Sequence, residues 1–180
     1  MQLTRSALPD VVIVEPKVLG DARGFFFESW NRRDFAAAGL DVDFVQDNHS
    51  RSRRGVLRGL HYQIEHAQGK LVRVIEGAVL DVAVDLRRSS ATFGRHVAIE
   101  LSAGDHRMLY IPPGFAHGFI VVSKVAGFLY KTTDYWYPEH ERTLLWNDPA
   151  LRIEWPAGVS PTLAPKDAAG TPLAQADVYA

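Results

Sequence analysis

The sequence contains no cysteine, which excludes a disulfide, a thiolate metal site and a thiol nucleophile. It also lacks a long apolar run, because its longest apolar stretches fall far short of the ~20 residues that a membrane helix requires. Residues 1–10 do not have the charged head and apolar run of a secretory signal. We therefore expect a soluble, cytoplasmic protein with no membrane partner.

An excess of charge of one sign is absent as well. The 180 residues include 20 basic and 21 acidic side chains, spread along the chain without a basic stripe. Binding of a nucleic acid polymer depends on such a stripe, so we expect none as a partner. No shift in composition, internal repeat or low-complexity segment divides the chain, and its length suits one core. The sequence therefore predicts a single domain over residues 1–180.

Short runs rich in valine, isoleucine and aromatic residues are plentiful. They lie at residues 11–14, 72–75, 79–86, 97–101, 108–111, 119–122 and 128–133. Turn-forming glycine, proline and aspartate separate these runs, which is typical of short strands. The run at 79–86 alternates with a period of two, which places Leu80, Val82, Val84 and Leu86 on one face.

Helical signals are scarce by comparison. Only residues 32–38 have a helical pattern, with Asn31 as a plausible N-cap and Gly39 as the stop. The Pro- and Ala-rich segment after Trp155 predicts loop and turn. Many short strands with few helices predict an all-β protein, either a β-sandwich or a jelly roll.

Two of the seven histidines lie in strand-like apolar surroundings beside glycine, His61 and His117. A buried imidazole there must find partners and can be poised near neutral pH, although a satisfied core histidine is an equal alternative. Metal-binding jelly rolls often use a His-x-His pair with a following carboxylate, but here Gln63 occupies the second position and Glu65 lies on a predicted loop. We therefore expect no metal, which leaves His61 available as a base. We expect the other histidines to be ordinary solvated or hydrogen-bonded side chains; they are His49, His66, His96, His106 and His140.

Three more polar residues interrupt apolar strands and have two readings each. Lys70 is either a strand end that snorkels to solvent or a fixed cation for an enolate oxygen. Tyr130 is either a core tyrosine or a general acid. Arg58, like Arg23, Glu28 and Glu141, is by default an ordinary surface charge, but its apolar neighbours predict a buried guanidinium in need of a carboxylate or phosphate. Strict alternation places Arg58 and His61 on opposite faces, so a shared pocket requires a bulge, which we expect at Gly59.

Motifs along nearly the whole chain resemble the dTDP-4-dehydrorhamnose 3,5-epimerase family. They are residues 21–29 (DARGFFFES), 44–50 (FVQDNHS), 58–63 (RGLHYQ), 68–73 (QGKLVR), 113–118 (PGFAHG), 130–135 (YKTTDY) and 166–167 (KD). The resemblance implies a cupin-type jelly roll, or double-stranded β-helix, with short peripheral helices. It also implies a homodimer that exchanges an N-terminal strand, a dTDP-sugar substrate, and neither a metal nor an organic cofactor.

The same resemblance assigns roles to individual residues. It makes His61 the base that removes a proton beside the 4-keto group, with Asp167 as the carboxylate that orients it. Lys70 is then the cation at the enolate oxygen, and Tyr130 returns a proton from the opposite face. The positions that match substrate-binding residues are Arg23, Glu28, Gln46, Asp47, Asn48, Arg58, Lys70, His117, Trp136, Glu141 and Lys166.

One position departs from the family pattern. Trp136 stands where the family usually has a tyrosine that stacks on thymine, and an indole can stack at least as well. The implied reaction inverts carbons 3 and 5 of dTDP-4-keto-6-deoxyglucose. The alternatives are a mono-epimerase of another deoxysugar pathway, a non-catalytic sugar-nucleotide-binding jelly roll, and a metal-dependent cupin.

Overall fold

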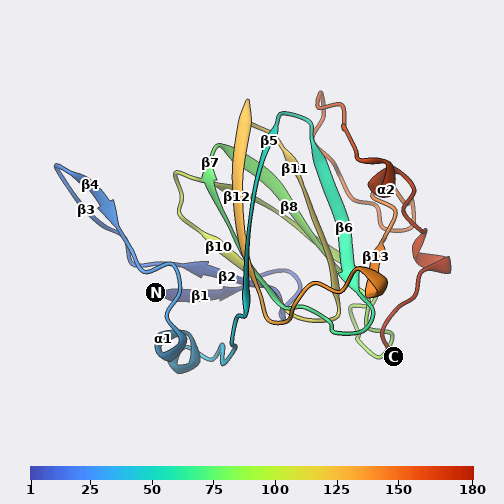
Figure 1. Ribbon diagram of the computed structural model, residues 1–180, viewed down its shortest axis with the longest axis horizontal. Coiled ribbons are helices and arrows are strands. Elements are labelled where there is room, and N and C mark those ends of the chain that lie inside the picture. The colour runs from blue at the N-terminus through green and yellow to red at the C-terminus, as the bar shows by residue number, and fades with distance from the viewer.

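Two antiparallel sheets face each other and form a jelly roll in the computed structural model, which describes all 180 residues (Figure 1). The first sheet has the order β1 (Gln2–Arg5), β2 (Val12–Glu15), β10 (Met108–Ile111), β7 (Lys70–Glu76), β12 (Val125–Thr132), β5 (Gln46–Arg53). The second has the order β13 (Glu141–Thr143), β6 (Leu57–Gln63), β11 (Phe115–Val121), β8 (Ala78–Asp85), β9 (His96–Ser102). The predicted all-β jelly-roll class is confirmed.

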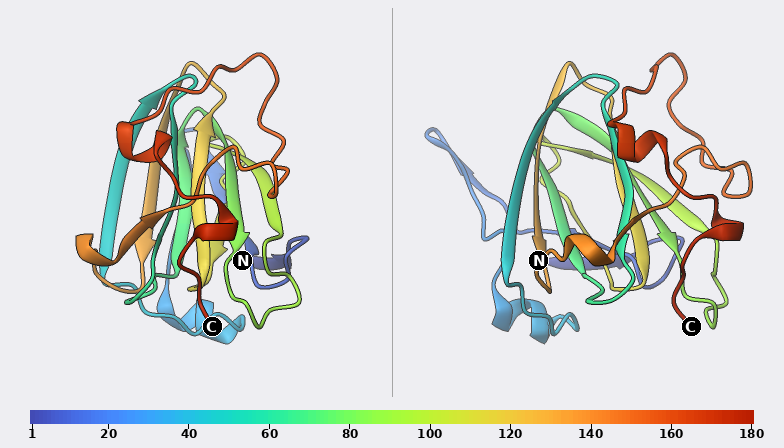
Figure 2. Two further views of the ribbon diagram at one scale, coloured as in Figure 1. Left: turned by 90° about the vertical axis from the view of Figure 1, so that its right-hand side faces the viewer. Right: turned by 45° about the vertical axis from the view of Figure 1, so that its right-hand side comes forward.

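A hairpin of β3 (Leu19–Asp21) and β4 (Gly24–Phe26) projects away from the sandwich (Figures 1 and 2). Its strands are exposed throughout, and Phe25 and Phe26 have 63% and 66% of their surface accessible. Aromatic side chains on so thin an element have no core of their own to enter, so the hairpin leaves apolar surface uncovered in the single chain.

The helices are short. They are α1 (Arg32–Ala37), α2 (Pro165–Ala168) and the single-turn 3₁₀ helices η1 (Pro138–His140) and η2 (Leu173–Gln175). Asn31 caps α1 as predicted, since its side chain accepts a hydrogen bond from the Asp34 amide. The prediction of loop and turn after Trp155 is wrong at α2 and η2, which are too short for a periodic signal. None of the helices is long and apolar enough to cross a membrane.

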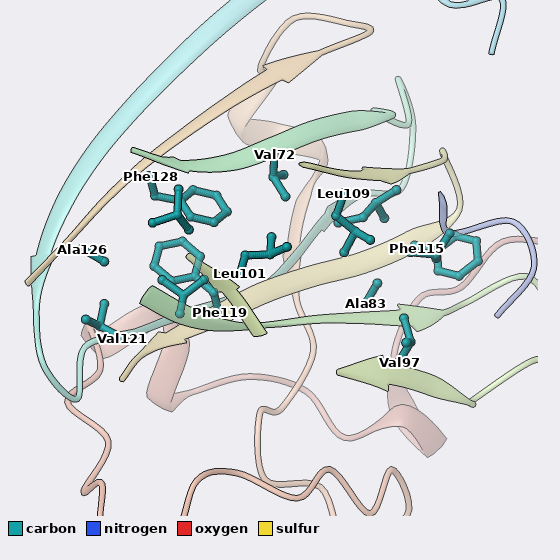
Figure 3. Close-up of a cluster of buried hydrophobic side chains, with 14 of the residues drawn as sticks. Val72, Ala83, Val97, Leu101, Leu109, Phe115, Phe119, Val121, Ala126 and Phe128 are labelled. Atoms are coloured by element: carbon teal, nitrogen blue, oxygen red, sulfur yellow. The ribbon is translucent and has the colours of Figure 1, made fainter. Parts of the chain in front are cut away.

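The main core fills the space between the two sheets (Figure 3). Phe119 of β11 stacks on Phe128 of β12 with ring centroids 4.1 Å apart, so an aromatic pair joins the two layers. Val72 and Leu109 extend the cluster along the first sheet. This apolar filling occupies one part of the interior and leaves the remainder for polar side chains.

The outer face of each sheet is also covered in part. Val82, Val84 and Leu86 pack together with the C-terminal segment, and Leu80 lies against the same cluster, which confirms the predicted shared face. On the other sheet, Phe35 of α1 packs against the outward side chains of β7 and β10. The C-terminal segment that packs on the second sheet includes α2 and places it beside β6 (Figure 1).

Candidate active site

A cavity of about 440 Å³ opens between the sheets and is lined from β5, β6, β7, β11, β12, β13 and α2. Its size is typical of a small-molecule site. The predicted site residues that line it are Gln46, Asn48, Arg58, His61, Lys70, His117, Tyr130, Trp136, Glu141, Lys166 and Asp167. Residues from Gln46 to Asp167, far apart in the sequence, therefore meet in one place.

A bulge in β6 brings Arg58 and His61 to the same side. His117 pairs with His61 while Phe119 pairs with Arg58, so three steps along β6 match two along β11. The extra residue reverses the alternation, and both side chains line the cavity. Gly59 has a φ of +124°, and a Cβ there would lie 2.6 Å from Gly118 Cα, so glycine is required. The bulge predicted at Gly59 is confirmed.

His61 and Asp167 form a close pair. The Nε2 atom of His61 lies 2.6 Å from Asp167 Oδ1, and the aspartate is 2% exposed on α2. A carboxylate only accepts hydrogen bonds, so the Nε2 atom carries the proton and the lone pair is left on Nδ1. The pair joins a strand to a helix 106 residues later and holds the imidazole in the tautomer that a general base needs.

Lys70 is buried beside this pair. Its Nζ atom donates to the His61 carbonyl oxygen at 3.3 Å. Burial lowers the pKa of Lys70 to about 8, while the negative charges of Asp81 and Glu141 act in the opposite direction. A side chain that is only 6% exposed does not extend to solvent, so the interpretation of Lys70 as a snorkelling strand end is wrong.

A second imidazole and carboxylate pair lies next to Lys70. The His117 Nε2 atom is 3.0 Å and 3.1 Å from the two oxygens of Asp81, and both residues are buried. Burial lowers the pKa of His117, and the Asp81 carboxylate opposes that shift. Sequence reasoning missed Asp81. The sequence contained a signal for it, because Asp81 shares one face of a predicted strand with the apolar residues Val79 and Ala83.

Tyr130 and Arg58 lie on opposite sheets. Burial raises the pKa of Tyr130; the Glu141 charge adds to that shift and the Arg58 charge opposes it. Arg58 donates from Nε to Ser52 Oγ at 3.1 Å. The prediction that Arg58 is buried is wrong, because the bulge turns its guanidinium into the open cavity, where it is exposed.

The rim of the cavity is polar and aromatic. Lys166 Nζ lies 3.0 Å from Glu141 Oε1, and Gln46 Nε2 donates to Asn48 Oδ1 at 3.0 Å. The Asn48 Nδ2 atom is buried without a hydrogen-bond partner. Trp136 is 55% exposed at the mouth. Gln63 and Gln68, which sequence reasoning also missed, line the same space.

Three predicted substrate-binding residues do not line this chain's cavity. Arg23 lies at the turn of the β3–β4 hairpin, where its side chain is 90% exposed and paired with Asp21. Glu28 follows the same hairpin. Asp47 is exposed on β5 and pairs with Lys131 at 2.9 Å. No group of three or more histidine, aspartate or glutamate side chains is arranged to hold a metal ion.

Comparison with known proteins identifies the family of the chain. The model of the dTDP-4-dehydrorhamnose 3,5-epimerase family matches residues 5–175. The chain belongs to the dTDP-4-dehydrorhamnose 3,5-epimerase family. A relative of that name from Pseudomonas aeruginosa is 62% identical over 99% of this chain and 99% of its own length.

Solved structures support the assignment of the chain to this epimerase family. A dTDP-6-deoxy-D-glucose-3,5-epimerase from Legionella pneumophila, in complex with dTDP-4-keto-L-rhamnose, has a TM-score of 0.94 at 49% identity. The match covers 97% of this chain and 93% of that one. A 3'-monoepimerase from Streptomyces bikiniensis, in complex with dTDP-quinovose, has a TM-score of 0.89 at 32% identity, covering 94% and 87%. The predicted family and enzyme class, an isomerase, are confirmed.

Proposed function

We propose that this epimerase inverts carbons 3 and 5 of dTDP-4-keto-6-deoxyglucose to give dTDP-4-keto-rhamnose, through an enolate that is reprotonated on the opposite face. The pairing of His61 with Asp167 at 2.6 Å, in one cavity with Lys70 and Tyr130, carries the proposal. The 3,5-epimerase names of the relatives and the ligand of the Legionella protein support the substrate.

His61 is the base. Carbons 3 and 5 both adjoin the ketone at carbon 4, so removal of either proton gives an enolate on the same oxygen. The Nδ1 lone pair takes the proton, and the imidazolium that forms is stabilised by the buried Asp167 carboxylate. The imidazole needs no redox partner for this step, because the reaction only moves protons.

Lys70 stabilises the enolate. A fixed cation in a site from which water is largely excluded interacts strongly with a developing oxyanion. Lys70 is buried, lies within hydrogen-bonding distance of the main chain of His61 and lines the same cavity as the His61 side chain. In the proposed complex the cation faces the oxygen at carbon 4 and the base faces the adjoining carbon. Near neutral pH the ammonium form predominates, since the pKa of Lys70 is about 8.

Tyr130 returns the proton. It lies on β12 of the first sheet, whereas His61 lies on β6 of the second, so the two side chains approach a bound sugar from opposite layers. Burial raises the pKa of Tyr130, which keeps the phenol protonated as a general acid at neutral pH. Removal on one face and return on the other is what inverts a carbon centre.

The remaining lining residues bind the substrate. Arg58 and Lys166 carry the charge that suits a diphosphate. Trp136 presents an exposed indole on which the thymine can stack. Hydrogen bonds to the sugar hydroxyl groups and to the carbonyl and imide groups of the thymine need donors and acceptors. The side chains of Gln46, Asn48, His117 and Glu141 supply them. The unpartnered Nδ2 atom of Asn48 is a donor that the substrate can satisfy.

The protein is further proposed to work as a homodimer of one-domain chains, each spanning residues 1–180. The β3–β4 hairpin would carry Arg23 and Glu28 into the cavity of the partner subunit. The exposure of Phe25 and Phe26, and the projection of the hairpin from its own sandwich in Figure 1, support this exchange. Asp47 stays a predicted substrate-binding residue, and location in the cytoplasm stays a prediction.

Deuterium exchange tests the reaction. Proton NMR of dTDP-4-keto-6-deoxyglucose with the protein in heavy water follows the label at each carbon. Deuterium at carbons 3 and 5 is expected. Entry at carbon 3 alone would make the protein a mono-epimerase, and entry at neither would overturn the proposal.

A further inference from the structure

Residues 135–137 form an aromatic loop at the mouth of the cavity. Of its three aromatic side chains, only Trp136 lines the cavity. The loop has no strand partners, and its indole is 55% exposed, so packing alone does not fix the ring. The direction of the indole therefore depends on what holds the backbone on either side of it.

The side chain of Gln63 holds that backbone. Its Oε1 atom accepts a hydrogen bond from the Tyr137 amide at 2.8 Å, and its Nε2 atom donates to the Tyr135 carbonyl at 3.2 Å. The same Nε2 atom donates to the His66 carbonyl at 2.7 Å. Both N–H groups and the oxygen of one amide are thus used, and two of the three residues bound are those that flank Trp136.

Burial makes this clamp stiff. Gln63 is 3% exposed, so losing one partner would leave a desolvated donor or acceptor in the protein. The other side-chain hydrogen bonds to the loop are one-sided: Gln68 donates to the carbonyls of Asp134 and Tyr135, and Gln46 accepts from the Trp136 amide at 3.3 Å. The His66 ring stacks on Tyr137 but makes no hydrogen bond to the loop. Only Gln63 bonds the loop both before and after the indole.

Gln63 also belongs to the strand that carries the base. It lies two residues after His61 on β6, so one rigid strand sets both the base and the loop. We propose that Gln63 is a positioning residue that fixes Trp136 as the stacking surface for the base of a nucleoside diphosphate sugar. This inference rests on the proposed function, in which Trp136 meets the thymine.

A double-mutant cycle tests the inference, with dTDP affinity measured by calorimetry. Trp136→Ala is expected to weaken binding roughly 5- to 150-fold, as for lost base–aromatic stacking. Gln63→Met, which keeps the length and removes the hydrogen bonds, is expected to weaken it roughly 3- to 10-fold. The double variant should bind no more weakly than Trp136→Ala alone, because Gln63 acts through the indole. Additive losses would overturn the inference.

Tyr179→Phe is the matched control. The Tyr179 hydroxyl donates to the main-chain carbonyl of Gln63, so this variant loses a hydrogen bond to the same residue without touching the loop. It should bind dTDP like the wild type. A loss equal to that of Gln63→Met would assign the effect to β6 as a whole and overturn the inference.

Hydrogen exchange separates this inference from the proposed function. Because the Tyr137 amide donates to Gln63, Gln63→Met should make it exchange roughly 10-fold faster or more. Unchanged exchange would overturn the positioning role. Faster exchange, with Trp136→Ala binding dTDP normally, would instead refute the thymine-stacking role of Trp136 and with it the nucleotide part of the inference.

Discussion

Asp81 and Asp85 are both fully buried on β8, yet their partners differ. Burial by itself would raise the pKa of Asp85, but hydrogen bonds from Arg87, Ser90 and Thr92 outweigh it and hold the pKa well below its usual range. The Asp81 carboxylate instead accepts hydrogen bonds from one donor only, the Nε2 atom of His117, and lies near the cationic Lys70. A buried carboxylate with so few donors is costly unless a nearby charge balances it.

Asp81→Asn should therefore change the pH dependence of catalysis. Asp81 raises the pKa of Lys70 against the effect of burial, so losing its charge should lower that pKa further below about 8. The alkaline limb of kcat/KM should move to lower pH, because deprotonated Lys70 cannot stabilise the enolate. Asp81 and Glu141 act on Lys70 directly. The other titratable or charged side chains that share its cavity include Arg58, His61, His117, Tyr130, Lys166 and Asp167.

Asp85→Asn is the control for this prediction, since it removes an equally buried charge from the same strand outside the cavity. It should lower stability and leave the alkaline limb in place. An unmoved limb in Asp81→Asn would show that Asp81 does not act on Lys70.

Residue roles were predictable to different degrees. The sequence singled out His61, Lys70 and Tyr130 because polar groups in apolar strands are unusual, and the family motifs added Asp167. Gln63 was considered only as a missing metal ligand. Its role depends on a loop 72 residues away, which no local pattern reports.

At the scale of elements, strands with apolar runs were predicted, whereas β1, β5, β13 and the β3–β4 hairpin were not. β5 reads QDNHSRSR and has no apolar residue, because one side of it lines a polar cavity and the other is exposed. Its position comes from pairing with β12 over the whole of its length. Tertiary pairing, not propensity, makes this segment a strand.

The bulge in β6 is the element on which the site depends. Gly59→Ala should destabilise the fold by about 1–3 kcal/mol or more, from the positive φ and from contact with Gly118. It should also lower activity, because β6 would move away from β11 and take His61 with it. Urea unfolding and steady-state rates measure the two effects.

Gly158→Ala is a suitable comparison, because Gly158 also has a positive φ but nothing lies within 4 Å of the added Cβ. It should lose stability from backbone strain alone and keep its activity. Equal losses of activity in both variants would argue that the bulge does not position His61.

At the scale of the whole molecule, Arg23 and Glu28 lie outside the cavity of their own chain, and the proposed dimer would bring them into the cavity of the partner subunit. A subunit with Arg23→Ala and a subunit with His61→Ala should complement each other if the hairpin is exchanged. In such a mixed dimer one cavity has both an intact His61 and an intact hairpin.

Mixing the two inactive variants in equal amounts should then restore about a quarter of the wild-type sites, once subunits exchange. Separately purified variants, assayed unmixed, provide the baseline. If mixing restores nothing although mixed dimers form, Arg23 does not act in the cavity of the partner subunit.

In the proposed mechanism, a base on one sheet and an acid on the other invert the same carbon. The most direct test is proton NMR of the substrate in heavy water with Tyr130→Phe, compared with His61→Asn. Tyr130→Phe should still exchange the protons at carbons 3 and 5 while epimerisation falls roughly 100-fold or more, and His61→Asn should abolish both. Equal loss of exchange and inversion in Tyr130→Phe would contradict the two-sided mechanism.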